Sequence, residues 1–267
     1  MLEITLVKDL IDEVFVPLNR AYLKKIYSDT SFHKIFGIYK IALLPLMNEK
    51  HYEEELKKIL KIYSNKNLIL DEETKNFFEM FLFLYLNWLR KKNNQGLIKL
   101  KKLLEIEKFL DINNFHNLTI SIDDFKIVDV DELISNEGLD DDMLLDLRDL
   151  IGEYRYMSND DTLINDVYAE QFLKIINNLS LFIKEYDELK YLDMLLSKIS
   201  SYFKLDFDKL TNAQSEQLKN TVDEIVFFIE KWIKEVFFEK KIKDVTSLDA
   251  LILSEMAKLE IIGIKGN

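Results

Sequence analysis

Cysteine is absent from this chain of 267 residues, and turn-forming residues are scarce, with six glycines and two prolines. Without cysteine the chain has no disulfide, no thiolate nucleophile and no cysteine-based zinc or iron–sulfur site. So few turn formers argue against an all-β fold, and the lack of a glycine-rich loop argues against a Rossmann or P-loop nucleotide site. These shortages predict long helices joined by short polar loops.

The apolar residues recur with helical spacing. One run, residues 77–89, is interrupted only by Glu79 and Asn87 and is apolar on every side, which predicts a buried central helix over residues 72–92. The run is shorter than the roughly 20 apolar residues that a membrane span needs. Pro17 is expected to kink or divide the first helix. The predicted fold is all-α, with a helix content well above the third that is usual in globular proteins.

Pattern and composition divide the chain into three parts. Residues 1–112 are predicted to form an N-terminal helical domain around the apolar helix. Residues 113–157 form an acidic connecting segment with at most a small β-hairpin, because polar and β-branched residues alternate near its start. Residues 158–267 are predicted to form a four-helix bundle. One of its helices begins at a Thr-x-x-Gln capping box and carries a regular apolar row, consisting of Leu218, Val222, Ile225, Ile229, Ile233 and Val236.

The net charge of −12 is concentrated in one stretch. Residues 123–166 hold fifteen acidic and three basic residues, while the rest of the chain is balanced. Fifteen like charges repel one another unless nearby cations neutralise them. We therefore expect this stretch to lie outside both hydrophobic cores and to bind a partner with a basic surface. The residues that we expect to carry this binding are Asp140, Asp141, Asp142, Asp146 and Asp149.

Two other interpretations of the acidic stretch stay open. The chain has its own basic cluster within residues 90–102, and the acidic stretch would then mask these cations until a partner competes for them. Alternatively, the stretch is a solvated surface that aids solubility. Asp140, Asp141, Asp142 and Asp146 also allow a carboxylate-only site for a divalent cation, but an acidic helix start is more often a solvated N-terminus.

His33 and Gly37 stand four residues apart on a predicted helix. This spacing resembles the His-x-x-Lys-Gly motif of histidine phosphotransfer domains, which are helical bundles, but Phe36 occupies the lysine position and Ile38 replaces the usual small residue. The resemblance implies a phospho-acceptor role for His33 in a two-component phosphotransfer or phosphatase protein, which is the alternative function. Because the lysine is missing, we expect His33 to be dispensable for phosphate chemistry.

The sequence favours a non-catalytic protein–protein interaction or signalling protein over an enzyme. It contains no Glu-x-x-His metal motif and no nucleophile–base pair that the spacing selects, so no cofactor or metal is predicted. The acidic balance disfavours nucleic-acid binding. Charged residues near the start do not fit a secretory signal, and no segment has transmembrane length, so we expect a cytoplasmic protein without a membrane partner. A homo-oligomer is compatible with the sequence.

Overall fold

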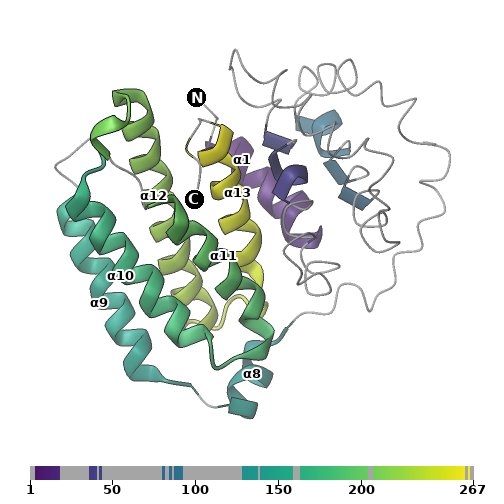
Figure 1. Ribbon diagram of the computed structural model, residues 1–267. Coiled ribbons are helices and arrows are strands. Elements are labelled where there is room, and N and C mark those ends of the chain that lie inside the picture. Colours follow the sequence, from purple (N-terminus) through teal and green to yellow (C-terminus); the bar gives the residue numbers. More distant parts are fainter. Residues whose placement is uncertain are drawn as a thin grey trace, which may run out of the picture. The chain divides into compact units, whose positions relative to one another are not determined.

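Helix accounts for 86% of the residues placed with confidence, which confirms the all-α fold. The chain divides into two compact units, residues 1–126 and 127–267, and each is described by itself. None of the helices in the described part of the chain is long and apolar enough to cross a membrane. The predicted hairpin region, residues 118–130, lies outside the described residues except for residues 128–130. This computed structural model (Figure 1) describes residues 4–18, 36–40, 42–43, 80–81, 84–85, 87–92, 128–137, 139–158, 163–203, 207–261 and 264.

The first unit begins with α1, Ile4–Leu10, which continues into a π-helical turn, η1, Ile11–Phe15. In this turn the N–H of Val16 donates to the carbonyl of Ile11, five residues back. Pro17 follows directly and has no N–H to donate, so the chain departs from α-helical geometry beside the proline.

Aromatic side chains hold the described parts of the first unit together. The rings of Phe15 and Tyr39 have centroids 4.0 Å apart, and the hydroxyl of Tyr85 donates to the carbonyl of Ala42 at 2.5 Å. Tyr85 also stacks between Phe81 and Trp88. These three residues belong to the predicted central helix, and all of them are buried. Within the described residues the segment is helical, and its apolar part is buried at Met80, Phe81, Tyr85, Trp88 and Leu89, while the cations at residues 90–92 are exposed.

The second unit is built from helices that close into a ring. Helix α9 packs on α10, α10 on α11, α11 on α13, α13 on α12, and α12 on α9 again. Figure 1 shows these helices running alongside one another. The principal helices and the short helical turns between them are α8, Val130–Glu137; α9, Asp141–Ser158; α10, Asp166–Ile183; η6, Asp187–Leu189; α11, Lys190–Tyr202; η7, Phe207–Lys209; α12, Asn212–Trp232; η8, Ile233–Phe238; and α13, Ser247–Ile261.

Local sequence signals fix where these helices begin. The side chain of Asn165 accepts a hydrogen bond from the N–H of Tyr168 at 3.1 Å and so caps α10. The capping box predicted at Thr211 and Gln214 is present at the start of α12. The apolar row predicted along α12 and η8 is buried throughout, at Leu218, Val222, Ile225, Ile229, Ile233 and Val236.

Helix α13 is the most deeply buried element of the second unit. Eleven of its fifteen residues are buried, on all sides of the helix. The segment before it is held by backbone pairing, because the N–H of Val245 donates to the carbonyl of Val128 at 3.1 Å and the N–H of Val130 donates to that of Lys243 at 3.0 Å. The indole N–H of Trp232 also donates to the carbonyl of Val245, at 3.0 Å. These bonds fix the start of α13 against α12 and the entry to α8.

The expectation that residues 123–166 lie outside the hydrophobic core is wrong for α9. This helix packs against α10 and α12, and it therefore joins the four helices predicted for the C-terminal bundle as a fifth member. Its sequence is acidic, but apolar residues recur every three or four positions along one side of the helix, and that stripe is wide enough to pack. The residues that it buries are Leu144, Leu147, Ile151 and Tyr154.

The substitution Leu147→Ala tests the membership of α9 in the core. Because Leu147 is fully buried, we expect the free energy of unfolding to fall by about 2–5 kcal/mol. Leu145→Ala, on the same helix but at a side chain that is 38% exposed, is the control and should change it by about 0.5 kcal/mol or less. Urea unfolding of both variants measures the difference, and equal values would contradict this packing.

Candidate functional site

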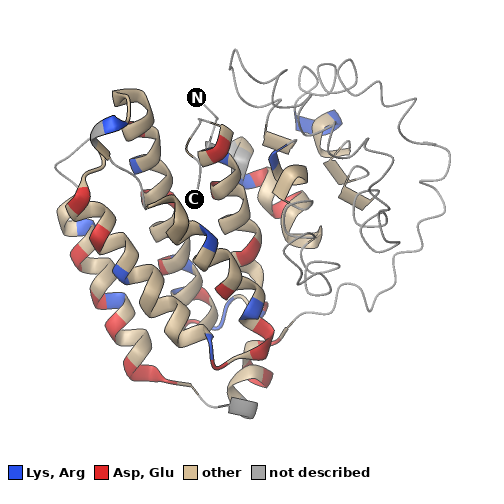
Figure 2. Ribbon diagram, in the orientation of Figure 1, with Lys and Arg blue, Asp and Glu red and all other residues tan. Residues whose placement is uncertain are grey.

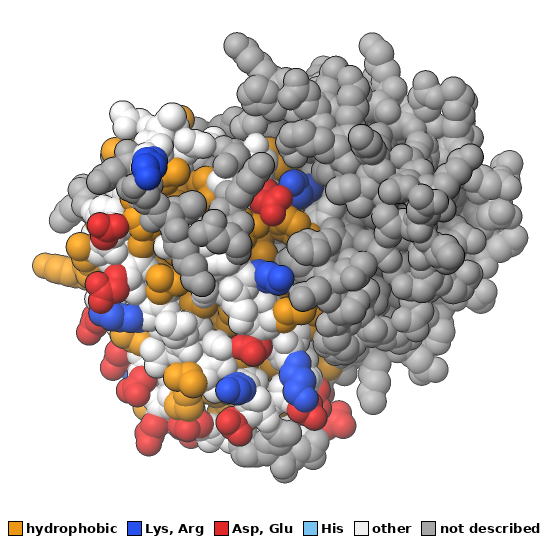
Figure 3. All heavy atoms as spheres, viewed as in Figure 1, with side chains coloured by type: hydrophobic (Ala, Val, Ile, Leu, Met, Phe, Trp, Pro, Cys, Tyr) orange, Lys and Arg blue, Asp and Glu red, His pale blue; other side chains and the backbone are white. Residues whose placement is uncertain are grey.

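The candidate site is the solvent-facing side of α9, where carboxylates recur along the length of the helix (Figure 2). Figure 3 shows acidic side chains lining that edge of the unit. The side chain of Asp140, just before the helix, accepts a hydrogen bond from the N–H of Met143 at 2.9 Å, and acids at this end suit the helix dipole. We call the following exposed residues the acidic face: Asp140, Asp141, Asp142, Asp146, Asp149 and Glu153.

The periodicity of the helix separates the acidic face from the packed side. Asp142, Asp146, Asp149 and Glu153 follow one another at steps of four, three and four residues, so they form one row along the helix. The buried residues of α9 form a second row with the same period, displaced around the helix axis. The packing of α9 therefore determines that the carboxylates meet solvent.

Few cations among the described residues lie close enough to neutralise the acidic face. Arg148 lies 3.7 Å from Asp149, but both side chains are more than half exposed, so the pair contributes little. Arg155, the other cation of α9, forms an ion pair with Glu230 on α12. Asp142, Asp146 and Glu153 form no ion pair with any residue that the structure describes. The face therefore keeps most of its negative charge.

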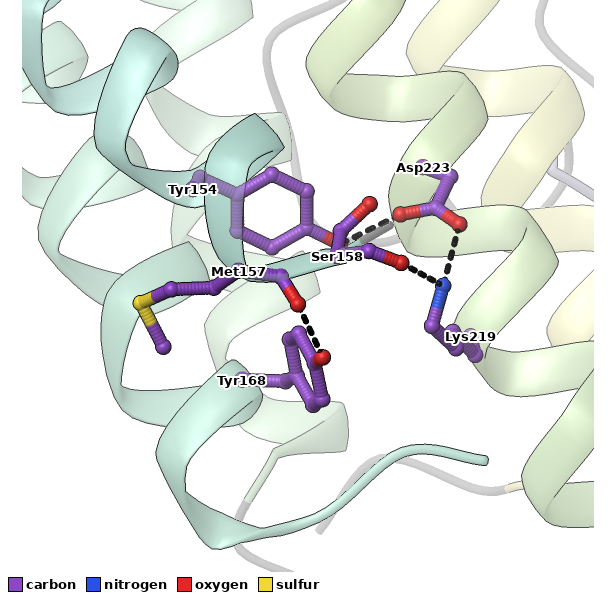
Figure 4. A network of polar contacts seen from close by, with 6 residues as sticks. All are labelled: Tyr154, Met157, Ser158, Tyr168, Lys219 and Asp223. Atoms are coloured by element: carbon purple, nitrogen blue, oxygen red, sulfur yellow. Dashed lines mark hydrogen bonds and ion pairs between the residues drawn. The ribbon is translucent and has the colours of Figure 1, made fainter. Parts of the chain in front are cut away.

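Two neighbouring helices anchor the last turn of α9, as Figure 4 shows. The hydroxyl of Tyr154 donates to Oδ1 of Asp223 at 2.6 Å, and Nζ of Lys219 lies 2.8 Å from Oδ2 of the same carboxylate. Lys219 also donates to the carbonyl of Ser158 at 3.2 Å. The hydroxyl of Tyr168 donates to the carbonyl of Met157. These bonds satisfy carbonyls that a helix end leaves without partners.

The electrostatics of this anchor favour a structural role. Burial is the largest cause that raises the pKa of Tyr154, and the hydrogen bond to Asp223 raises it further, so the phenol stays protonated and donates. Lys219 is buried beside Asp223, and its ammonium lies 5.6 Å from the ring centroid of Tyr168. Because the ammonium is held by a carboxylate, a carbonyl and a ring, it positions α9 and is not presented to a substrate.

A second buried polar cluster connects α12 to α13. Nζ of Lys258 lies 2.6 Å from Oε2 of Glu224 and 2.6 Å from Oε1 of Glu255, whose side chain is fully buried. Burial raises the pKa of Glu255 to about 8, and repulsion from Glu224 adds to this, while Lys258 opposes it. Burial therefore favours the protonated, neutral form of Glu255 beside the ammonium of Lys258 and the carboxylate of Glu224.

The sequence singled out the aspartates of the acidic face, whose binding role stays a prediction, and it did not single out the other two groups. All five aspartates predicted to bind a partner lie in the acidic face, and the structure adds Glu153 to them. The predicted set did not include the anchor at Lys219 or the cluster at Lys258. A signal was present for the second, because Glu255 and Lys258 are charged residues within a helix that is apolar on every side.

Several other predicted residues lie outside the described part of the chain. His33 is one of them, so its role stays a prediction. Among the described residues, no group of three or more acidic or histidine side chains is placed to hold a metal ion, and Asp140, Asp141, Asp142 and Asp146 do not converge on one point. In the basic cluster, Lys92 forms ion pairs with Asp9 and Glu13 of its own unit.

Comparison of the chain with protein-family models, with curated proteins and with solved structures finds no match.

The substitution Tyr154→Phe tests the anchor of α9. It removes the hydroxyl that donates to Asp223 and leaves this partly buried carboxylate with one partner fewer, so we expect the free energy of unfolding to fall by about 1–2 kcal/mol. Tyr156→Phe removes the same group two residues away, where the side chain is exposed, and should change it by less than about 0.5 kcal/mol. Chemical denaturation of both variants provides the measurement.

The buried cluster predicts a specific dependence of stability on pH. The pKa of Glu255 is about 8 in the folded protein and 4.5 in the unfolded chain. Between these two pH values Glu255 holds its proton in the folded state and has lost it in the unfolded state. The free energy of unfolding of the wild type therefore declines by about 1.4 kcal/mol for each pH unit that the pH rises. Glu255→Gln cannot ionise, so the stability of the variant relative to wild type should rise by about 4 kcal/mol from pH 5 to pH 8.

Urea unfolding of both proteins at four pH values between 5 and 8 measures this change. Glu216→Gln, at an exposed position on α12, is the control and should follow the wild-type pH dependence. A constant difference between wild type and Glu255→Gln across this window would show that Glu255 is ionised in the folded protein.

Proposed function

We propose that this chain is a non-catalytic protein–protein interaction protein of the cytosol that binds a partner with a basic surface through the acidic face of α9. The observation that carries the proposal is that this row of exposed carboxylates has few counter-charges of its own, while the opposite side of the same helix is packed and anchored. A surface of this kind attracts cations over a distance of about 10 Å at 0.1 M salt, and this attraction accelerates association.

The charge distribution around α9 supports an external partner. Other acids near the start of the second unit form ion pairs with lysines of the same unit. Asp131 pairs with Lys240 at 2.8 Å, and Asp129 pairs with Lys243 at 3.4 Å. The carboxylates of the acidic face have no such lysines beside them among the described residues. Lys92, from the chain's own basic cluster, is engaged by Asp9 and Glu13, which reduces the cations left for self-masking.

The test replaces Asp140, Asp141, Asp142, Asp146 and Asp149 together with asparagine. Cytosolic proteins retained by the wild-type chain at about 50 mM salt and released at about 500 mM are identified, and the association rate of each is measured. We expect the variant to lose at least about tenfold in association rate, with its helix content unchanged.

A matched control removes the same number of charges from other exposed sites, at Glu185, Asp187, Glu188, Glu216 and Glu239. This control should bind like the wild type, because the interaction depends on where the charge lies and not on the net charge. If the α9 variant keeps every interaction of the wild type, the acidic face is only a solvated surface. If it instead gains affinity for a polyanion such as heparin, the face masks the chain's own lysines.

A further inference from the structure

Three exposed apolar residues stand at the junction between the end of α9 and the start of α10, next to the last carboxylate of the acidic face. Tyr156 is 84% exposed, Val167 is 57% exposed and Leu163 is 39% exposed. Because the hydroxyl of Tyr168 reaches the carbonyl of Met157, the end of α9 that bears Tyr156 lies beside the start of α10, where Val167 stands. We call these three residues the apolar corner. Single exposed apolar residues are common on protein surfaces, but three at one junction, including a tyrosine, mark a candidate contact.

The apolar corner continues the row of carboxylates. From Glu153 the next step of three residues reaches Tyr156, so the row runs from Asp142 to Tyr156 at steps of four, three, four and three. Fourteen residues of helix span about 21 Å. Alternating steps of three and four are the spacing of a coiled-coil seam, along which a second helix packs. The row therefore has the geometry of a contact surface for a helix.

The charges along this row limit which kind of helix can bind to it. Lysine or arginine side chains at the same spacing would lie opposite the four carboxylates, and such complementarity sets the register of a complex. A second copy of this chain would place carboxylates against carboxylates, which like-charge repulsion disfavours. The phosphates of a nucleic acid or an anionic membrane would be repelled for the same reason.

We propose, on the basis of the function proposed above, that the partner segment is a basic amphipathic helix whose cationic row follows the acidic face and whose terminal apolar side chain covers Tyr156 and Val167. The carboxylates provide the attraction and the register. The apolar corner provides contact area that is removed from water, and so it distinguishes this helix from other basic segments.

Two synthetic peptides test the proposal. Both are alanine- and glutamine-based helices with lysine at positions i, i+4, i+7 and i+11. One carries leucine at i+14 and the other carries alanine there. Each is titrated into the full chain by fluorescence anisotropy. We expect the leucine peptide to bind the wild type roughly tenfold more tightly than the alanine peptide, as burial of one large apolar side chain implies. A peptide with glutamate in place of lysine should not bind.

Variants of the chain assign the two contributions. The double substitution Tyr156→Ser and Val167→Ser should make the two peptides bind equally. Neutralising Asp142, Asp146, Asp149 and Glu153 should weaken both peptides and remove their dependence on salt. The matched control, Leu181→Ser with Phe227→Ser, removes two exposed apolar residues elsewhere and should preserve the preference for leucine.

The possible failures are distinguishable. If both peptides bind the wild type equally and with salt dependence, the apolar corner makes no contribution and this inference is overturned, while the proposed function stands. If neither peptide shows salt-dependent binding, the proposed function fails with it. If the chain forms dimers that the Tyr156→Ser and Val167→Ser variant cannot form, the apolar corner serves self-association, and the basic-helix partner is refuted.

Discussion

The burial of one apolar stripe of α9 between α10 and α12 determines how the rest of the second unit is presented to solvent. Each of these two helices buries its own apolar row, and α9 closes the ring between them. A helix has a fixed angular spacing, so fixing the side that packs also fixes the side that does not. The carboxylates of α9 lie together on the surface because their apolar neighbours are held in the core.

Helix α12 connects the two buried polar groups of this unit. Asp223 and Glu224 are adjacent in sequence and therefore point about 100° apart around the helix. The first receives hydrogen bonds from Tyr154 in the last turn of α9 and from Lys219 of α12 itself, and the second pairs with Lys258 on α13. Each of these partly buried acids has a cation within reach, which offsets the cost of removing both charges from water. These pairs specify the neighbours of α12 on two sides.

The anchor and the acidic face have different roles in the proposed interaction. The hydrogen bonds from Lys219 and Tyr168 hold the last turn of α9, so the exposed row is already ordered before a partner arrives. A preorganised surface loses less conformational entropy on binding than a flexible one. An anchored row of carboxylates that ends at Tyr156 therefore combines long-range attraction with a short-range contact that selects among basic segments.

The sequence by itself determined the all-α fold, the capping box at Thr211, the buried row of α12 and the identity of the exposed aspartates, because each depends on the spacing of residues within one helix. It did not place α9 in the core, because the density of charge around Leu147 hid the apolar stripe. It also could not reveal that Lys219 and Asp223, four residues apart, form a buried anchor, since the same spacing is typical of a surface ion pair. The pairing of Glu224 with Lys258 joins residues 34 positions apart. Only the packing of α12 against α13 brought these two together, and only the burial that this packing produces set the pKa of Glu255.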